Sequence, residues 1–299
     1  MTLLEVRDLE KSFPVRRGGL KRTAPVKVVD GISFDVERGK TVALVGESGA
    51  GKSTTAYLVL RLIEANAGSI VLSGMDVRSL NKEALRKART KMQIVFQDPH
   101  SSLDPRVSIG RSVAEPLRVL LGMNRADREA RASRMLERVA LRPEIADRMP
   151  HELSGGQLQR VAIARALTLG PDLIVCDEAV SALDVSVRAQ VLNLLMDIQA
   201  EDHLSYIFVS HDLAIVENIS DDVLVMQHGR IVEYGPTAKV LGNPSEKYTQ
   251  ALLDAVPVPD PKRRTWRGVP TMDDEDGDAD DDGIASAPRP LAAASVDQS

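Results

Sequence analysis

The sequence predicts an α/β fold with a helical insertion, on the basis of two patterns in its apolar residues. Four short and mostly apolar runs are typical of strands buried on both faces of a parallel sheet; they are residues 42–45, 92–96, 173–176 and 206–209. Helical periodicity is seen at residues 54–63, 125–141, 158–169 and 187–199. Because strands and helices alternate on the outer flanks while the middle is mostly helical, we expect an α/β core interrupted by a helical segment at about residues 98–169.

The composition is that of a folded protein without membrane spans. The chain has 299 residues, of which 43% are hydrophobic and 27% are charged. Charges interrupt every apolar stretch before the roughly 18 uncharged residues that a spanning helix needs. The N-terminal residues contain no hydrophobic block of the secretory kind, so we expect a cytoplasmic chain. The single Cys176 excludes an internal disulfide.

Negative charge is concentrated at the C-terminal end. Residues 271–299 contain nine acidic residues and the one base Arg289, a net charge of −8, which leaves +3 of the total of −5 on residues 1–270. With almost no large apolar side chains, this segment is expected to be a disordered acidic tail, and a docking tail for a basic partner is the alternative. The remaining charge is too small to indicate nucleic acid as a partner. Residues 16–25, rich in glycine and basic residues, are expected to form a loop insertion.

A phosphate-binding loop follows the first predicted strand of the core. Residues 46–53 read GESGAGKS, which fits the pattern G-x-x-x-x-G-K-[ST] between a strand and a helix. Its backbone N–H groups and the helix N-terminus would surround phosphate oxygens, Lys52 would contact the β- and γ-phosphates, and Ser53 would ligate Mg²⁺. The alternative is a glycine-rich turn that binds nothing. The expected nucleotide-binding residues are Gly46, Glu47, Ser48, Gly49, Ala50, Gly51, Lys52, Ser53 and Thr54.

Two acids end the third predicted strand, which reads LIVCDE at residues 173–178. We expect Asp177 to emerge beside the phosphate loop and to hold Mg²⁺ through water, and Glu178 to polarise the attacking water. An apolar run that ends in two acids is also common at ordinary strand ends, so the catalytic interpretation depends on the preceding loop.

The run LSGGQLQRVAIARAL at residues 153–167 resembles the signature sequence of ABC-type ATPases, and the resemblance covers about residues 3–260. It implies a P-loop NTPase core with a mixed sheet, an N-terminal antiparallel β part and a helical subdomain. Two such domains would pair head to tail, so that Ser154, Gly155, Gly156 and Gln157 of one contact the ATP of the other. The helix start would supply the backbone donors; a plain helix cap is the alternative.

Other family positions follow from the resemblance. Gln97 matches the Q-loop glutamine, which approaches Mg²⁺ and water. His211 matches the switch histidine, which bonds the γ-phosphate and helps to position Glu178. Phe13 matches the aromatic residue that stacks on adenine, with a core or staple role as the alternative. The D-loop, which implies contact across the dimer, is Ser181, Ala182, Leu183 and Asp184.

Several segments are similar to the dipeptide and oligopeptide importer branch, in particular to its F-type ATPase subunit. They are QDPHSSLDPR at residues 97–106, ALDVSV at residues 182–187 and a C-terminal segment at about residues 235–262 that contains YTQALL. Two features differ from relatives. Residues 177–181 read DEAVS where the family usually has DEPTS, and the C-terminal cysteines that bind an iron–sulfur cluster in some relatives are missing, so no cluster is expected.

The resemblance implies an ATPase subunit that uses ATP and Mg²⁺ to energise an importer of di- or oligopeptides or related solutes such as nickel complexes, glutathione or glycosides. Its partners would be two permease subunits, a second ABC ATPase and, indirectly, a solute-binding protein. A heterodimer of ATPases is favoured and a homodimer is the alternative. The chain would lie at the cytoplasmic face of the inner membrane. The alternative functions are an accessory ATPase of a soluble enzyme complex such as carbon–phosphorus lyase and a catalytically silent partner subunit.

Overall fold

The structure is a computed structural model and describes residues 1–14 and 25–255. The acidic tail expected at residues 271–299, and the loop expected at residues 16–25 apart from its last residue, lie outside the described residues. Within the described part, no helix has the length and apolar character needed to cross a bilayer.

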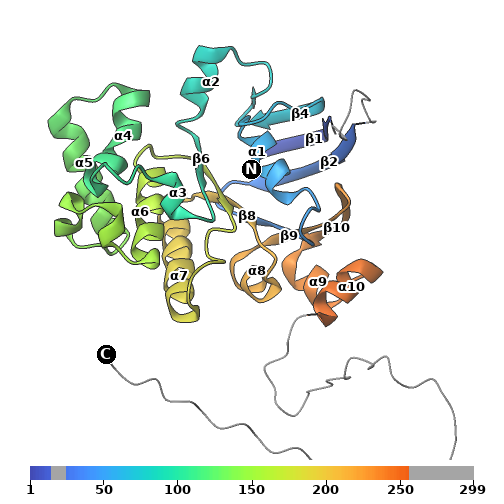
Figure 1. Cartoon of the computed structure of the whole chain (residues 1–299). Coiled ribbons are helices and arrows are strands. Elements are labelled where there is room, and N and C mark those ends of the chain that lie inside the picture. Colours follow the sequence, from blue (N-terminus) through green and yellow to red (C-terminus); the bar gives the residue numbers. More distant parts are fainter. Residues whose placement is uncertain (15–24, 256–299) are drawn as a thin grey trace, which may run out of the picture. The chain divides into compact units, whose positions relative to one another are not determined.

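A six-stranded sheet forms the centre of the fold (Figure 1). Its strand order is β10 (Arg230–Pro236), β9 (Asp222–Gln227), β3 (Thr41–Val45), β8 (Ser205–Val209), β7 (Leu173–Asp177) and β6 (Met92–Val95). All strands from β9 to β6 are parallel to their neighbours, and β10 pairs with β9 in the antiparallel direction. The four predicted strands are therefore confirmed. Every residue of β3, β7 and β8 is buried, because helices and a second sheet cover both faces.

A second, antiparallel sheet is built from the N-terminal part of the chain. Its order is β2 (Val26–Glu37), β1 (Thr2–Phe13), β4 (Ala67–Leu72) and β5 (Met75–Asp76). Leu4 and Val6 of β1 lie in one apolar cluster with Val42 and Leu44 of β3, so the two sheets share a core. The mixed architecture and the antiparallel N-terminal part implied by the resemblance are confirmed.

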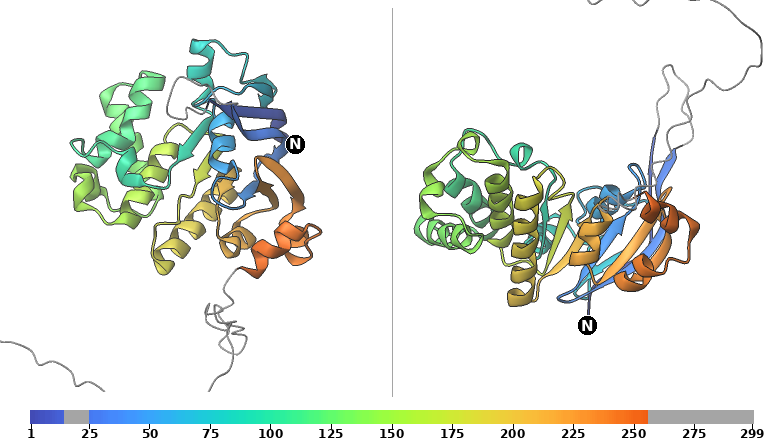
Figure 2. Two further views of the ribbon diagram at one scale, coloured as in Figure 1. Left: turned by 45° about the vertical axis from the view of Figure 1, so that its right-hand side comes forward. Right: turned by 90° about the horizontal axis from the view of Figure 1, so that it is seen from below.

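Ten α-helices and two short 3₁₀ helices of the described residues surround the sheets. The α-helices are α1 (Lys52–Val59), α2 (Lys82–Ala88), α3 (Pro99–Ser102), α4 (Ile109–Leu121), α5 (Arg125–Arg138), α6 (Gly155–Leu167), α7 (Val185–Asp202), α8 (Leu213–Ile219), α9 (Thr237–Gly242) and α10 (Lys247–Asp254). The 3₁₀ helices are Pro143–Asp147 and Pro150–Glu152. Helices α3 to α6 lie together at the β6 end of the central sheet, and α9 and α10 lie at the β10 end (Figures 1 and 2).

The helix after the phosphate loop differs from its prediction. Periodicity predicts residues 54–63, but α1 begins at Lys52 and ends at Val59. Arg61 has a φ of 47°, which breaks the helical path. Its guanidinium donates hydrogen bonds to the carbonyl oxygens of Val77 and Leu80 at 3.0 and 2.6 Å. These contacts hold the turn after α1 against the segment that follows β5 (Met75–Asp76).

Candidate nucleotide site

The loop between β3 and α1 depends on glycine at two positions. Gly46 has a φ of 143°, and a Cβ atom there would lie 2.2 Å from the Met226 carbonyl oxygen. Gly51, the N-cap of α1, has a φ of 103°, and its Cβ would lie 2.6 Å from the Val28 carbonyl oxygen. Neither position accepts a side chain, because neighbouring strands pack directly against the backbone. The glycines thus hold the loop in a fixed, closely packed curve.

The tip of the loop faces solvent, but the lysine does not. Glu47, Ser48 and Gly49 are exposed, Ala50 is buried, and Ser53 and Thr54 are half-buried. Lys52 is 6% exposed, and its Nζ donates hydrogen bonds to the carbonyl oxygens of Gly46 and Glu47 at 2.7 and 2.8 Å.

The charge of Lys52 is held in a buried site. Burial lowers the pKa of the Lys52 ammonium, and the nearby carboxylates of Glu178 and Asp177 oppose that shift. Its present partners are neutral carbonyl groups, which a phosphate oxygen can replace as a stronger, charged acceptor.

Asp177 lies at the carboxyl end of β7 and is 6% exposed. The Ser53 hydroxyl donates to its Oδ1 at 2.8 Å, and the Tyr57 hydroxyl donates to its Oδ2 at 2.8 Å. Burial and this carboxylate raise the pKa of Tyr57 to about 12, so the phenol stays protonated as a donor. Sequence reasoning missed Tyr57, although it lies four residues after Ser53 and hence on the same face of α1.

The oxygen ligands around Asp177 fit Mg²⁺, which prefers carboxylate, hydroxyl, phosphate and water oxygens. Within the described part of the chain, no group of three or more histidine, cysteine or acidic side chains could hold a metal ion. A magnesium ion at Ser53 and Asp177 would therefore depend on phosphate and water for its remaining ligands.

Glu178 lies just past the end of β7 with a left-handed backbone, at a φ of 49°. Its N–H donates to the Val209 carbonyl at 3.0 Å, and its own carbonyl accepts the Ser181 hydroxyl at 2.9 Å. The Nδ1 of His211, which follows β8, lies 3.4 Å from Glu178 Oε1. Such a backbone is costly for a residue other than glycine, and here the strand end and the turn hold the carboxylate beside the histidine.

Gln97 makes no hydrogen bond to these groups. It follows β6 and is exposed, and no hydrogen bond of its side chain occurs among the described residues. The preceding Phe96 ring lies 6.5 Å from the Tyr57 ring, at an angle of 59°. The Gln159 side-chain amide, buried on α6, lies 3.5 Å from the Phe96 carbonyl. The Q-loop position is thus connected to α1 and α6, but not to Asp177 directly.

The segment at residues 154–157 begins helix α6. Ser154 is its N-cap: its hydroxyl accepts the Gln157 N–H at 3.3 Å, and its own N–H donates to the Gln157 side chain at 3.0 Å. Ser154 and Gly155 are exposed, and Gly156 packs so closely that a Cβ would lie 2.4 Å from Val187 Cγ1. The capping role is therefore present, and it leaves the outer surface of this helix start uncovered.

The D-loop residues connect the end of β7 to α7. Ala182 and Asp184 are exposed, while Ser181 and Leu183 are half-buried. The Leu183 carbonyl accepts a hydrogen bond from Arg188 at 3.1 Å. The D-loop therefore carries two exposed side chains just before α7, the helix on which the start of α6 packs through Gly156.

Phe13 ends β1 and is 38% exposed. The Lys11 ammonium lies 5.0 Å from the centre of the Phe13 ring and donates to the Glu64 carbonyl at 2.6 Å. This cation–π contact fixes the ring from one side. Phe13 is therefore a surface residue and not part of the apolar core.

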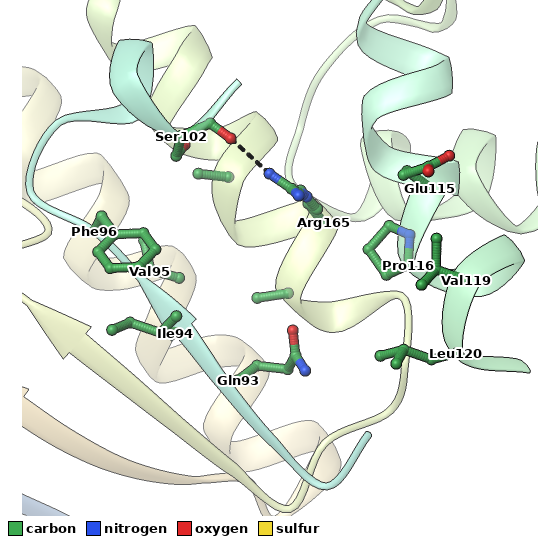
Figure 3. A pocket seen from close by; sticks show the side chains of 12 residues that line it. Gln93, Ile94, Val95, Phe96, Ser102, Glu115, Pro116, Val119, Leu120 and Arg165 are labelled. Atoms are coloured by element: carbon green, nitrogen blue, oxygen red, sulfur yellow. Dashed lines mark hydrogen bonds between the residues drawn. The ribbon is translucent and has the colours of Figure 1, made fainter. Parts of the chain in front are cut away.

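A groove of about 400 Å³ lies beside the Q-loop position, between β6, α4 and α6 (Figure 3). Ile94 of β6 and Val119 and Leu120 of α4 give it an apolar lining, and Val119 is 45% exposed. Arg165 of α6 donates to the Ser102 carbonyl at 2.7 Å, as the dashed line in Figure 3 shows. Burial lowers the pKa of Arg165, and Glu115 opposes the shift.

The fold and the site together define the class of protein to which the chain belongs. A glycine loop joins β3 to α1, and an acid pair lies at the carboxyl end of β7, which is separated from β3 by β8. This is the arrangement of a P-loop nucleotide-binding domain.

Comparison with known families gives a narrower assignment. Residues 29–181 match the family described as "ABC transporter", and residues 232–281 match "Oligopeptide/dipeptide transporter, C-terminal region". The chain belongs to the ABC transporter ATP-binding family. The resemblance to its oligopeptide/dipeptide branch is confirmed.

Relatives and solved structures agree with this assignment. The chain is 52% identical over 274 residues to the glutathione import ATP-binding protein GsiA of Salmonella typhimurium, covering 91% of this chain but 44% of that protein. It is 50% identical over 262 residues to a probable peptide ABC transporter ATP-binding protein, y4tS, of Sinorhizobium fredii, covering 87% of this chain and 74% of that protein. The chain therefore spans less than half the length of the glutathione import relatives.

Among solved structures, cbiO1 from Clostridium perfringens, part of the transporter complex cbiONQ, matches with a TM-score of 0.70 and 27% identity over 81% of this chain and 91% of that one. A dimeric cassette, MJ0796, bound to ADP and Pi in a post-hydrolysis state, matches with a TM-score of 0.69 and 25% identity over 79% of this chain and 99% of that one.

Proposed function

We propose that this chain is the ATP-hydrolysing subunit of an importer for di- or oligopeptides or related small solutes. The observation that carries the proposal is the assembly at the ends of β3, β7 and β8. A buried Lys52 lies in a glycine loop, Asp177 is held by Ser53, and Glu178 lies beside His211. This assembly provides a cation for phosphate, oxygen ligands for Mg²⁺ and a carboxylate that can orient water.

The proposed residue roles follow from these positions. Lys52 binds the β- and γ-phosphates, and the backbone N–H groups of residues 46–54 surround them. Glu178 orients and polarises the attacking water, and His211 positions the Glu178 carboxylate and bonds the γ-phosphate. Ser53, Gln97 and, through water, Asp177 would hold Mg²⁺, and the ion would supply positive charge against the phosphates. Phe13 offers its free ring face for stacking on adenine.

A second ATPase subunit completes the site in this proposal. The exposed N-terminus of α6 and the exposed D-loop residues support it, because their outer surfaces have no cover from the described part of the chain. Residues 154–157 would contact the γ-phosphate bound by the partner, and residues 181–184 would line the interface. We favour a heterodimer, with a homodimer as the alternative outcome.

Two permease subunits are the proposed membrane partners. The groove between β6, α4 and α6 supports this, because its apolar lining and half-exposed Val119 suit an apolar helix end from another chain. The groove adjoins Phe96 and Gln97, so an inserted helix would respond to movements at the nucleotide. The chain would then lie peripherally at the cytoplasmic face of the inner membrane, with a solute-binding protein as an indirect partner.

The accessory role in a soluble enzyme complex receives no support from the relatives, which are a glutathione import protein and a probable peptide transporter protein. No described feature favours it over the importer.

Affinity purification of the tagged chain from detergent-solubilised native membranes tests the function. We expect two permeases and a second ATPase to be recovered with the wild type, and the Val119→Asp variant to lose the permeases. Leu62→Asp is the matched control, because Leu62 is 46% exposed and lies outside the groove. Recovery of a soluble enzyme complex without permeases would contradict the proposal.

A further inference from the structure

Helix α10 contacts the phosphate loop through one side chain. The N–H group of Glu47 donates a hydrogen bond to the Tyr248 hydroxyl oxygen, with a nitrogen–oxygen distance of 3.1 Å. The two residues are 201 positions apart in the sequence. This bond therefore joins the segment that matches the C-terminal family region to the candidate nucleotide site.

Packing and charge fix the position of α10. Tyr248 packs against an apolar cluster that includes Val45, the last residue of β3 before the loop. Just before α10, the backbone N–H and the hydroxyl of Ser245 both donate to the Glu233 carboxylate, at 2.8 and 2.7 Å. Hydrogen bonds to an ionised carboxylate are among the stronger ones in proteins. The Tyr248 hydroxyl is therefore presented to the loop from a well-anchored helix.

The hydrogen bond acts on the peptide group at the start of the loop. The Gly46 carbonyl and the Glu47 N–H belong to one peptide group. Lys52 Nζ donates to its oxygen at 2.7 Å, and Tyr248 accepts from its nitrogen at 3.1 Å. A glycine at a φ of 143° tolerates rotation of the following peptide group more readily than other residues do. The Tyr248 hydroxyl thus opposes a rotation that would move the carbonyl oxygen away from the lysine.

We propose that Tyr248 is a positioning residue for nucleotide binding, acting through the Gly46–Glu47 peptide group on the loop and on Lys52. The inference rests on the proposed role of residues 46–54 in binding phosphate. When a phosphate oxygen replaces the carbonyl groups as the partner of Lys52, the hydrogen bond to Tyr248 remains to hold this peptide group. The C-terminal segment thereby contributes to the ATP affinity of the site.

The test compares Tyr248→Phe with Tyr234→Phe in the full chain. The control removes the same atom from a tyrosine whose hydroxyl donates to the Asp35 carbonyl at 3.3 Å, on β10. We expect the Kd for ATP of Tyr248→Phe to rise roughly two- to tenfold, as the loss of one hydrogen bond implies. Its KM for ATP should rise with it while kcat changes little, and Tyr234→Phe should match the wild type in all three.

Two further measurements separate the explanations. Lys52→Ala tests the phosphate loop itself: wild-type ATP affinity in this variant would overturn both the proposed loop role and the inference. If Lys52→Ala loses ATP binding while Tyr248→Phe keeps the wild-type Kd, only the positioning role fails. A lowered unfolding temperature of nucleotide-free Tyr248→Phe with an unchanged Kd would likewise overturn it, because the hydroxyl would then serve stability alone.

Discussion

The two candidate phosphate-facing surfaces of this chain differ in how they are held. At the loop before α1, Lys52 and Asp177 are both 6% exposed, and side chains from α1 and backbone groups of the loop hold them. At the start of α6, Ser154 and Gly155 are exposed, and the hydrogen bonds of Ser154 stay within its own helix turn.

The difference indicates which of the two surfaces is organised in the absence of nucleotide. A buried cation and a buried carboxylate carry a desolvation cost, which is offset only when hydrogen bonds and opposite charges are already in place. The first surface is therefore organised before nucleotide arrives. The second is an exposed helix start, which in our proposal acts only when another molecule presents a phosphate to it.

The largest effect is expected from Glu178→Gln at the first surface. The amide keeps the size of the side chain but cannot accept a proton from water, so turnover should fall by roughly 10²- to 10⁴-fold while ATP still binds. Steady-state hydrolysis and equilibrium binding measure the two effects. Glu137→Gln, an exposed acid on α5, is the control. Hydrolysis by Glu178→Gln at the wild-type rate would remove Glu178 from its proposed role.

A smaller effect is expected from Tyr57→Phe, which removes the hydroxyl that donates to Asp177 at 2.8 Å. Groups that orient a metal ligand typically change metal affinity by about 10- to 100-fold. The Mg²⁺ concentration that gives half-maximal hydrolysis should therefore rise, and chelation by EDTA should abolish hydrolysis in both proteins. An unchanged Mg²⁺ titration would show that Ser53 alone is sufficient to orient Asp177.

The smallest effect concerns stability at the second surface. Gly156→Ala places a Cβ 2.4 Å from Val187 Cγ1, so it should lower the free energy of unfolding by about 1–3 kcal/mol through overpacking. Gly155→Ala meets no atom within 4 Å and should leave stability unchanged or raise it by up to about 1 kcal/mol. Urea unfolding of the two variants measures the difference; equal stabilities would contradict the close packing of α6 on α7.

The fold was predictable where burial is uniform. Strands β3, β7 and β8 are buried along their whole length, so each appears as an apolar run. Strand β9, with four buried apolar residues between two polar ends, carries the same signal and was missed. The predicted end of α1 was wrong. The chain leaves the helix before Arg61, whose side chain bonds to residues 16 and 19 positions further along the sequence.

The site was predictable where its residues lie next to one another in the sequence. The glycine loop and the acid pair are local patterns, and the fold brings Ser53 and Asp177 into direct contact although they are 124 positions apart. Tyr57 and Tyr248 could not be found in that way. Each acts through one hydroxyl on a partner 120 or 201 positions away, and nothing in the residues beside it indicates which distant group the fold brings near.

The most direct test of the two surfaces measures ATP binding and turnover together for Lys52→Ala and Gly155→Ala, each in the proposed complex of the chain with its permeases. Both variants should lose turnover, by about tenfold or more, because both surfaces stabilise the reacting phosphate. Lys52→Ala should also lose ATP binding, whereas Gly155→Ala should bind ATP nearly as the wild type does. Wild-type turnover in Gly155→Ala, or an equal loss of ATP binding in both variants, would contradict the claim that the loop before α1 binds ATP while the start of α6 serves turnover.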